Sequence, residues 1–346
     1  MKNTKKKIRL SLCGLLFACM LSAQNLYVTL LPKEANHQVD VLIEGKLFTS
    51  FQYPTTQEKP FLYPIVSPEG STITRGFPLK PRQGERVDHP HHVGMWFNHG
   101  DVNGLDFWNN SYAIQDKSKY GHIVVTKILN VKSGKQAVLK VVSEWQDNEN
   151  QPLLEETTSY IFSATKQTRT IDHITTLKAL DKKVVFSDCK EGMIAIRMDR
   201  AFETPSTKAM TFVDANGIPT TVKGTPDNTG VNGHYYASCG ATGDDVWGTH
   251  NKWVMLSALK NGQLISLGFF DSPDNVGYPF HAHARGYGLF ACNNIGAKVY
   301  NKQEKAINVS LAPHQTLVLK HRFFMQSGKK VSVKQANEIS KAFAKK

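Results

Sequence analysis

Hydrophobic and polar residues alternate through much of this 346-residue chain, which is the period of β-strands. Between residues 120 and 190, short polar loops separate four β-branched segments: HIVVTKILNV, KQAVLKVVSEW, PLLEETTSYIFS and QTRTIDHITTLKAL. Loops this short predict an antiparallel meander, because parallel strands need long crossover connections. The dipeptide Asn261-Gly262 predicts a further hairpin. The segment AINVSLAPHQTLVLKHRFF predicts another.

Only the end of the chain has a helical pattern. Ser332 and Gln335 have the spacing of a capping box, and apolar residues follow on one side of the predicted helix. We therefore predict an all-β fold: one large two-sheet antiparallel β-sandwich over residues 24–326, followed by a short basic helix or tail over residues 327–346.

The first residues predict export. A basic segment, MKNTKKKIR, precedes the apolar run LSLCGLLFACMLSA, so we expect a signal peptide over residues 1–23, cleaved after Ala23. The predicted location is the periplasm or the cell surface. Acylation of Cys19, as in a lipoprotein, is the alternative. No later apolar run has the roughly 20 residues that a membrane-spanning helix needs.

Charge and cysteine content narrow the function classes. Five of the positive charges behind the formal net charge of +13 lie in the predicted signal peptide, so the mature chain would carry +8. No basic stripe interleaved with aromatic residues is present, which argues against nucleic-acid binding. The mature chain keeps Cys189, Cys239 and Cys292 without a C-x-x-C pair, which argues against thiol redox chemistry.

The segment RVDHPHHVGMWFNHGDVNGLDFWNN, residues 86–110, concentrates histidine and suggests a loop site. On an extended backbone His89 and His91 share one face, and His92 points to the other. Three interpretations stay open. The imidazoles could bind a divalent metal, with His89, His91 and His283 as ligands, or perform acid–base chemistry, or only tie the loop down.

Two later segments carry matching chemistry. In YPFHAHARGYGLFACNN, His281 and His283 alternate and Arg285 follows, whose planar guanidinium suits carboxylates or vicinal hydroxyls. In DCKEGMIAIRMDR, Glu191 and Arg197 flank a predicted buried strand, GMIAI. If the segments converge, the predicted catalytic residues are His91, His92, His283, Glu191 and Asp101. The predicted substrate-binding residues are His99, Asn103, Trp108, Arg285, Tyr287 and Arg197.

Aromatic residues flank the first histidine segment. Indole rings beside polar side chains suit sugars, whose C–H faces stack while their hydroxyl groups form hydrogen bonds. Trp108, next to two asparagines, is expected to be exposed and to act as the stacking surface. The sequence contains no G-x-S-x-G, dinucleotide-binding or P-loop motif, which argues against serine hydrolases and nucleotide-binding enzymes.

Four motifs, KPFLYPIVSPEGSTITRGFP, DHPHHVGMWFNHGDVNGLDFW, KEGMIAIR and HARGYGLFACNNIG, together resemble the secreted bacterial PmoA-like family. The resemblance runs from about Val39 to Phe324. That family is often labelled methane oxygenase. The methane monooxygenase subunit of that name spans the membrane several times, so we discard methane oxidation here. The resemblance instead implies an exported domain from bacteria that degrade complex glycans.

The expected fold also resembles the galactose-mutarotase-like supersandwich. In that superfamily a histidine protonates the sugar ring oxygen and a late glutamate takes the anomeric hydroxyl proton. The histidine role would carry over to His91 or His92, and to His283. The glutamate has no evident counterpart, because Glu304 lies in a polar turn and Glu338 in the tail helix.

These observations predict a carbohydrate-active protein that performs histidine–carboxylate chemistry on a sugar or keto-glycoside, by epimerisation, elimination or hydrolysis. A non-catalytic glycan-binding protein and a metal-dependent sugar enzyme are the alternatives. The predicted partner is a sugar or modified glycoside. No cofactor is predicted, except that a divalent metal stays possible.

Overall fold

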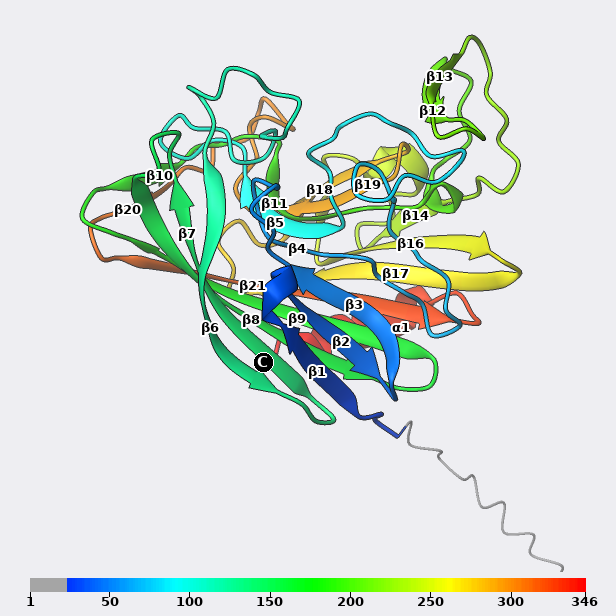
Figure 1. The fold of residues 1–346 in the computed structure, drawn as a ribbon, viewed down its shortest axis with the longest axis horizontal. Coiled ribbons are helices and arrows are strands. Elements are labelled where there is room, and N and C mark those ends of the chain that lie inside the picture. The colour runs from blue at the N-terminus through cyan, green and yellow to red at the C-terminus, as the bar shows by residue number, and fades with distance from the viewer. Residues whose placement is uncertain (1–23) are drawn as a thin grey trace, which may run out of the picture.

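Two large antiparallel β-sheets form the body of the computed structural model, which describes residues 24–346 (Figure 1). The predicted signal peptide, the cleavage after Ala23 and the acylation of Cys19 lie outside the described residues. The predicted two-sheet antiparallel sandwich is confirmed. Within the described residues, no helix has the length and apolar character needed to cross a membrane.

The first sheet contains nine strands. In spatial order they are β1 (Val28–Lys33), β2 (Gln38–Ile43), β3 (Lys46–Gln52), β4 (Phe61–Leu62), β5 (Met95–His99), β11 (Gly192–Arg197), β19 (Leu289–Asn293), β18 (Phe280–Arg285) and β15 (His250–Asn251). Only β11 and β19 separate β5 from β18. The two histidine-rich segments, far apart in sequence, therefore belong to the same region of one sheet.

The second sheet contains eight strands. In spatial order they are β14 (His234–Ala237), β16 (Trp253–Lys260), β17 (Gln263–Asp271), β21 (Thr316–Ser327), β9 (Thr168–Ala179), β8 (Pro152–Ala164), β7 (Ala137–Gln146) and β6 (His122–Lys132). The predicted meander is confirmed as β6 to β9. The predicted hairpin is confirmed as β16 and β17, where Lys260 pairs with Gln263 around Asn261-Gly262.

Smaller elements complete the fold. Two-stranded ribbons pair β10 (Val184–Phe186) with β20 (Val309–Leu311) and β12 (Met210–Val213) with β13 (Pro219–Val222), and the second ribbon projects from the body (Figure 1). Short 3-10 helices are η1 (Glu34–Asn36), η2 (Arg200–Phe202) and η3 (Gly243–Val246). The hairpin predicted in AINVSLAPHQTLVLKHRFF is wrong, because β20 pairs with β10 while β21 pairs with β17 and β9.

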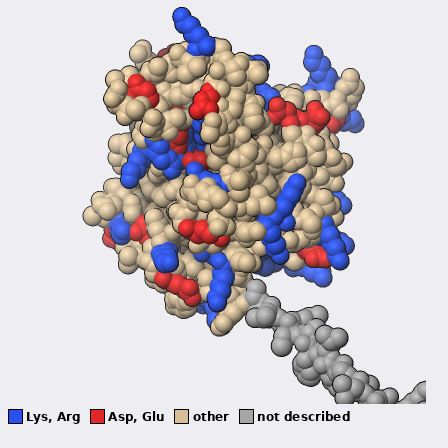
Figure 2. Space-filling view, turned by 90° about the vertical axis from the view of Figure 1, so that its right-hand side faces the viewer, with Lys and Arg blue, Asp and Glu red and all other residues tan. Residues whose placement is uncertain are grey.

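The C-terminal helix α1 (Val333–Phe343) confirms the predicted cap, since the Ser332 side chain accepts a hydrogen bond from the Gln335 backbone. Phe343 packs in a small apolar cluster with Trp253 and Phe324 of the eight-stranded sheet. The main core contains residues of both sheets. On the face that Figure 2 shows, lysine and arginine side chains are interspersed with acidic ones.

Candidate functional site

One row of paired residues crosses β5, β11, β19 and β18. Trp96 pairs with Ala195, Ala195 with Ala291, and Ala291 with His283, so the four side chains project from the same face of the sheet. Their neighbours along each strand belong to the main core, so this face points away from it. We call this outer surface of the four strands the histidine face.

Small residues in the row make room for a large ring. Trp108 belongs to the same apolar cluster as Ala195 and Ala291. Its ring centroid lies 5.1 Å from that of Trp96 and 6.2 Å from that of His283. Trp108 is only 1% exposed, so the prediction of an exposed stacking surface is wrong. The two alanines leave a gap in which the indole is buried, and Trp108 serves as a wall of the site.

The first histidine segment is a tight turn and not an extended strand. The His92 backbone donates a hydrogen bond to the His89 carbonyl, and Pro90 occupies the second turn position, which proline favours. His89 has a φ of 46°. The prediction that His92 points away from His89 is therefore wrong: the two rings stack in parallel, with centroids 4.8 Å apart.

The two histidine-rich segments meet at two contacts. The His89 ring stacks on Tyr287, with 5.0 Å between centroids and 3° between planes. Trp108, which belongs to the first segment, packs near His92 and reaches the second segment, because its centroid is 5.9 Å from that of His92 and 6.2 Å from that of His283. His91 packs edge-on against His92, with centroids 4.3 Å apart. The imidazoles from opposite ends of the chain thus converge on one face.

A buried ion cluster supports the turn. Asp88 Oδ1 lies 2.7 Å from Arg75 Nη1 and 2.6 Å from Arg197 Nη2. Burial alone would raise the pKa of Asp88, but hydrogen bonding with His89 and the two guanidinium charges lower it well below its usual range. Arg197 also contacts His92 Nδ1 at 3.0 Å. Sequence reasoning missed Asp88 and Arg75, because their carboxylate and guanidinium become partners only in the fold.

The central imidazoles are uncharged at neutral pH. Burial, together with the nearby charge of Lys59, lowers the pKa of His91 to about 2. Burial and Arg285 lower the pKa of His283 to about 3. His92 is 2% exposed, and burial and its neighbours also lower its pKa. Neutral rings can donate or accept hydrogen bonds, but they are not imidazolium acids.

Lys59 is a further candidate that sequence reasoning did not assign. Its ammonium donates a hydrogen bond to the Trp108 carbonyl at 3.2 Å and lies 5.6 Å from the Trp96 ring centroid. Burial lowers the pKa of Lys59 to about 7, against the opposing charges of Asp106 and Glu58. In the sequence, the only feature that could have indicated Lys59 was its position as the first residue of the KPFLYP motif.

Buried polar atoms without partners gather on the histidine face. Within the described residues, the buried atoms without a hydrogen-bond partner on this face include Trp96 Nε1, Asn98 Oδ1, Arg197 Nε, His281 Nδ1 and Nε2, His283 Nδ1 and Arg285 Nε, and the adjoining turn adds His91 Nε2. Most buried polar groups in proteins are hydrogen-bonded. A concentration of exceptions on one face indicates a place where a polar ligand supplies the missing partners.

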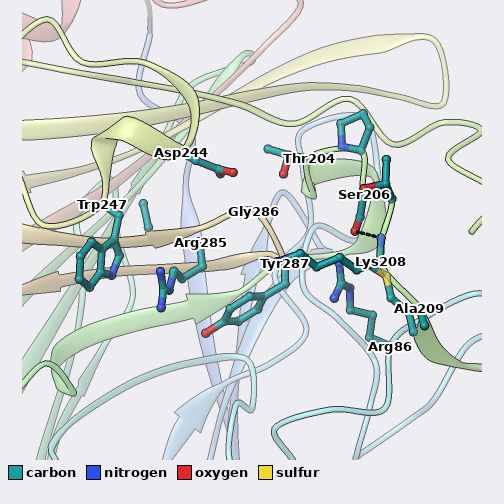
Figure 3. A pocket seen from close by; sticks show the side chains of 14 residues that line it. Arg86, Thr204, Ser206, Lys208, Ala209, Asp244, Trp247, Arg285, Gly286 and Tyr287 are labelled. Carbon is teal, nitrogen blue, oxygen red and sulfur yellow. Dashed lines mark hydrogen bonds between the residues drawn. The ribbon is translucent and has the colours of Figure 1, made fainter. Parts of the chain in front are cut away.

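A cavity of about 580 Å³ opens beside the histidine face (Figure 3). Arg285 and Tyr287, which close the turn between β18 and β19, line it together with Trp247, Asp244 and the loop 204–210. The Arg285 guanidinium lies 4.8 Å from a Trp247 ring centroid. Figure 3 shows Trp247, Arg285 and Tyr287 side by side along one wall. This volume is within the range of small-molecule sites.

Three predicted residues do not join the site. His99 is fully buried on the core side of β5, where its Nε2 lies 2.7 Å from the Ser187 carbonyl. Asp101 accepts a hydrogen bond from the Gly104 backbone, and Asn103 bonds to the backbones of Lys183 and Val185. These assignments are wrong because strand alternation directs His99 to the core, while Asp101 and Asn103 stabilise their own loop.

Glu191 keeps a position beside the site. Its carboxylate is half-buried and lies 3.3 Å from the Lys190 ammonium. Burial raises the pKa of Glu191, and the charge of Lys190 opposes this rise. Its predicted catalytic role stays a prediction.

A second polar cluster lies at the β15 end of the sheet. Glu304 Oε2 lies 3.0 Å from His250 Nε2 and 3.4 Å from His281 Nε2. Among the described residues, this is the group of histidine, cysteine and acidic side chains with a spacing that could hold a metal ion. His89, His91 and His283, the ligands considered for a metal from the sequence, are not part of this group. From the sequence, Glu304 was not assigned to the site because its neighbours are polar. In the fold its carboxylate lies against His281 of β18.

Comparison with protein-family models assigns the chain to a family. A model of a family of unknown function, DUF6807, matches residues 38–341. The chain belongs to this family. A search of curated proteins finds no match to the sequence. The resemblance to the PmoA-like family is not confirmed by these comparisons.

Solved structures of low similarity cover most of the chain. An α-galactosidase from Lactobacillus brevis is 9% identical with a TM-score of 0.34, and the match covers 87% of this chain but 39% of that protein. A putative aldose 1-epimerase from Escherichia coli K12 is 11% identical with a TM-score of 0.28, covering 87% and 98%. A galactose mutarotase related enzyme from Lactobacillus acidophilus is 9% identical with a TM-score of 0.28, covering 87% and 97%.

Proposed function

We propose that this DUF6807 member is an exported carbohydrate-active enzyme that binds a sugar or keto-glycoside on the histidine face. One observation carries the proposal: His91, His283 and Arg285 have buried polar atoms without hydrogen-bond partners, and Arg285 also lines the cavity of about 580 Å³. A polyhydroxylated ring would supply hydrogen bonds to these atoms, and the flanking aromatic side chains would pack against its C–H groups.

The chemistry follows from the charges of the groups. Neutral His91 and His283 donate hydrogen bonds to a carbonyl or hydroxyl oxygen on which negative charge develops. Lys59, whose pKa burial lowers to about 7, is the group best suited to take up and return a proton near neutral pH. In this scheme the Lys59 amine accepts the proton from a carbon beside the carbonyl, and the electron pair moves onto the oxygen held by imidazole.

Such proton abstraction can begin epimerisation, in which a water molecule or a second residue then delivers a proton to the opposite face of the same carbon. It also fits elimination, in which a leaving group departs from the neighbouring carbon. Hydrolysis would require water to enter the site. Of the three reactions first considered, the neutral imidazoles and the near-neutral amine favour the two that begin with proton abstraction next to a carbonyl.

The experiment uses the mature chain with glycosides and 3-keto-glycosides, followed by NMR. New anomeric or enone signals are expected, and their rate should fall at least a hundredfold in His91→Ala and His283→Ala. His314→Ala, which changes an exposed histidine remote from the face, is the matched control. Full activity in both site variants, with intact folding, would overturn the proposal.

A non-catalytic glycan-binding protein is the second candidate. The observation that favours it is the wall of Trp247, Arg285 and Tyr287, since an aromatic surface beside a guanidinium can hold a sugar without reacting with it. The same NMR experiment separates the two. Saturable line broadening of an unchanged ligand would assign binding alone.

Export is the remaining part of the proposal. The basic and apolar start of the sequence supports cleavage after Ala23 and delivery to the periplasm or cell surface, with acylation at Cys19 as the alternative. N-terminal sequencing of the protein recovered from fractionated cells tests this. A first residue of Gln24 is expected, whereas recovery of the uncleaved chain in the cytoplasm would contradict it.

A further inference from the structure

Two histidines face each other at the β15 end of the nine-stranded sheet. His250 on β15 and His281 on β18 occupy directly paired positions of neighbouring antiparallel strands. Their ring centroids are 3.8 Å apart. Directly opposed residues place their side chains on the same face, so backbone pairing itself brings the two imidazoles together.

Glu304 completes a three-residue group. Its Oε2 lies 3.0 Å from His250 Nε2 and 3.4 Å from His281 Nε2, and the candidate ligand atoms all lie within 4.8 Å of one another. Two ligands held roughly 2.0–2.1 Å from a tetrahedral metal are separated by about 3.3 Å. The observed spacing therefore needs little rearrangement to accept an ion between the three side chains.

Outer contacts orient two of these ligands. His250 Nδ1 lies 3.0 Å from the Pro279 carbonyl, and a proton donated there leaves the Nε2 lone pair free for coordination. Asn301 donates a hydrogen bond to the other Glu304 oxygen, Oε1, at 3.2 Å. Oxygen Oε2 is thereby directed toward the histidines. Such supporting contacts are typical of metal ligands.

His281 provides an independent observation. It is 0% exposed, and neither ring nitrogen has a hydrogen-bond partner among the described residues. Its contact with Glu304 is within ion-pair distance but lacks hydrogen-bond geometry. A buried imidazole without a hydrogen-bond partner is unfavourable, because it has lost its contacts with water. A bound ion would give His281 the partner that the protein does not supply.

The group also opens to solvent. The side chains of His250 and Glu304 are 46% and 29% exposed, so one side of the group is accessible. Two histidines and one carboxylate with an open position are the ligand set of catalytic zinc sites and of some iron sites. Tyr300 stacks on His281 with centroids 5.1 Å apart and lies 6.3 Å from the His283 centroid. The group thus adjoins the histidine face.

We propose that His250, His281 and Glu304 bind one divalent transition-metal ion, with Zn²⁺ the best match to these ligands, and leave a coordination position open toward solvent. This site stands on its own geometry and does not rest on the proposed sugar chemistry. An open ligand position next to His283 would suit a substrate oxygen or a water molecule.

The test is calorimetric titration of Zn²⁺ into the tag-free mature chain after chelator treatment and dialysis, with Co²⁺ absorption as a second readout. One ion per chain is expected, with the visible bands of tetrahedral Co²⁺. Affinity should fall at least tenfold in His281→Ala and in Glu304→Gln. Glu304 is only partly buried, so Glu304→Gln keeps the test valid if loss of the buried imidazole prevents folding.

Two controls separate this proposal from the sugar proposal. His283→Ala and His314→Ala should bind Zn²⁺ as the wild type does, because neither residue belongs to the three-residue group. Absence of stoichiometric binding, or unchanged affinity in folded Glu304→Gln, would overturn the metal site. Stoichiometric zinc binding by a protein that neither binds nor converts sugars would leave the metal site in place and overturn only the proposed function.

Discussion

The His89 imidazole lies flat against the Tyr287 phenol ring, with 5.0 Å between centroids and 3° between planes. The two residues are far apart in the sequence, and the order β5-β11-β19-β18 brings their segments together. Trp108 makes a second connection between the segments, since its ring packs near both His92 and His283. The site is therefore a product of sheet topology.

Loss of the carboxylate charge at Asp88 should destabilise the fold. Asp88→Asn leaves the guanidinium groups of Arg75 and Arg197 without their shared anion. We expect a loss of about 2 kcal/mol in the free energy of unfolding, less than for a fully buried pair because Asp88 is partly exposed. Urea denaturation at pH 7 measures it. Asp181→Asn, at an exposed acid, is the control, and equal midpoints for both variants would refute the role of Asp88.

Stability should depend on pH through Lys59. Its folded pKa, about 7, is below its unfolded value near 10.5, so the unfolded chain binds more protons between these two pH values. This contribution to stability therefore rises with pH in that window, by about 2 kcal/mol between pH 7 and 9. The rise should be absent in Lys59→Met and present in Lys166→Met, which changes an exposed lysine. Identical pH profiles in all three proteins would contradict a buried, near-neutral amine.

Filling the gap under Trp108 should impair ligand binding. Ala291→Leu adds three carbon atoms where the indole lies over the sheet, so the ring must move and stability should fall by about 1–3 kcal/mol. Ala258→Leu overpacks the core at a comparable buried position in the other sheet. Both variants should unfold earlier, but only Ala291→Leu should lose sugar binding in a titration. Equal loss of binding in both would show a general effect of overpacking.

Sugar binding should depend on the planar shape of the Arg285 side chain as well as on its charge. Arg285→Lys keeps a cation but removes the planar group that lies over Trp247. We expect about tenfold weaker sugar binding, which corresponds to the loss of about one good hydrogen bond or cation–π contact. Arg200→Lys changes another arginine that stacks on an aromatic ring, at 4.0 Å from the Phe212 centroid, and should bind normally. Unchanged affinity in Arg285→Lys would remove this residue from the site.

Local signals predicted much of the fold. The Asn261-Gly262 dipeptide specifies its hairpin because both residues adopt positive φ, 51° and 73°. The N-cap at Ser332 works in the same way, through a contact three residues along the chain, although the Gln335 side chain bonds to Gln326 and does not complete the capping box. The hairpin expected at residues 306–324 failed because β20 and β21 find partners elsewhere. The local pattern of hydrophobic and polar residues does not specify which distant strands pair.

The candidate site was predictable in its residue types but not in its geometry. Alternation placed His281, His283 and Arg285 on one face of β18, as the pairing of this strand confirms. The direction of His92 depends on a turn at Pro90, and the burial of Trp108 depends on alanines from other strands. Glu304 reaches His281 from a polar loop. These are tertiary contacts, which periodicity does not encode.

The central claim is that the imidazoles of both segments belong to one ligand site. NMR of ring-labelled histidine during titration with a 3-keto-glycoside tests it most directly, with signals assigned from the single alanine variants. The account predicts that the ring signals of His91 and His283 shift together and give one dissociation constant, while His314 does not respond. Separate midpoints for His91 and His283, or a response from only one of them, would contradict it.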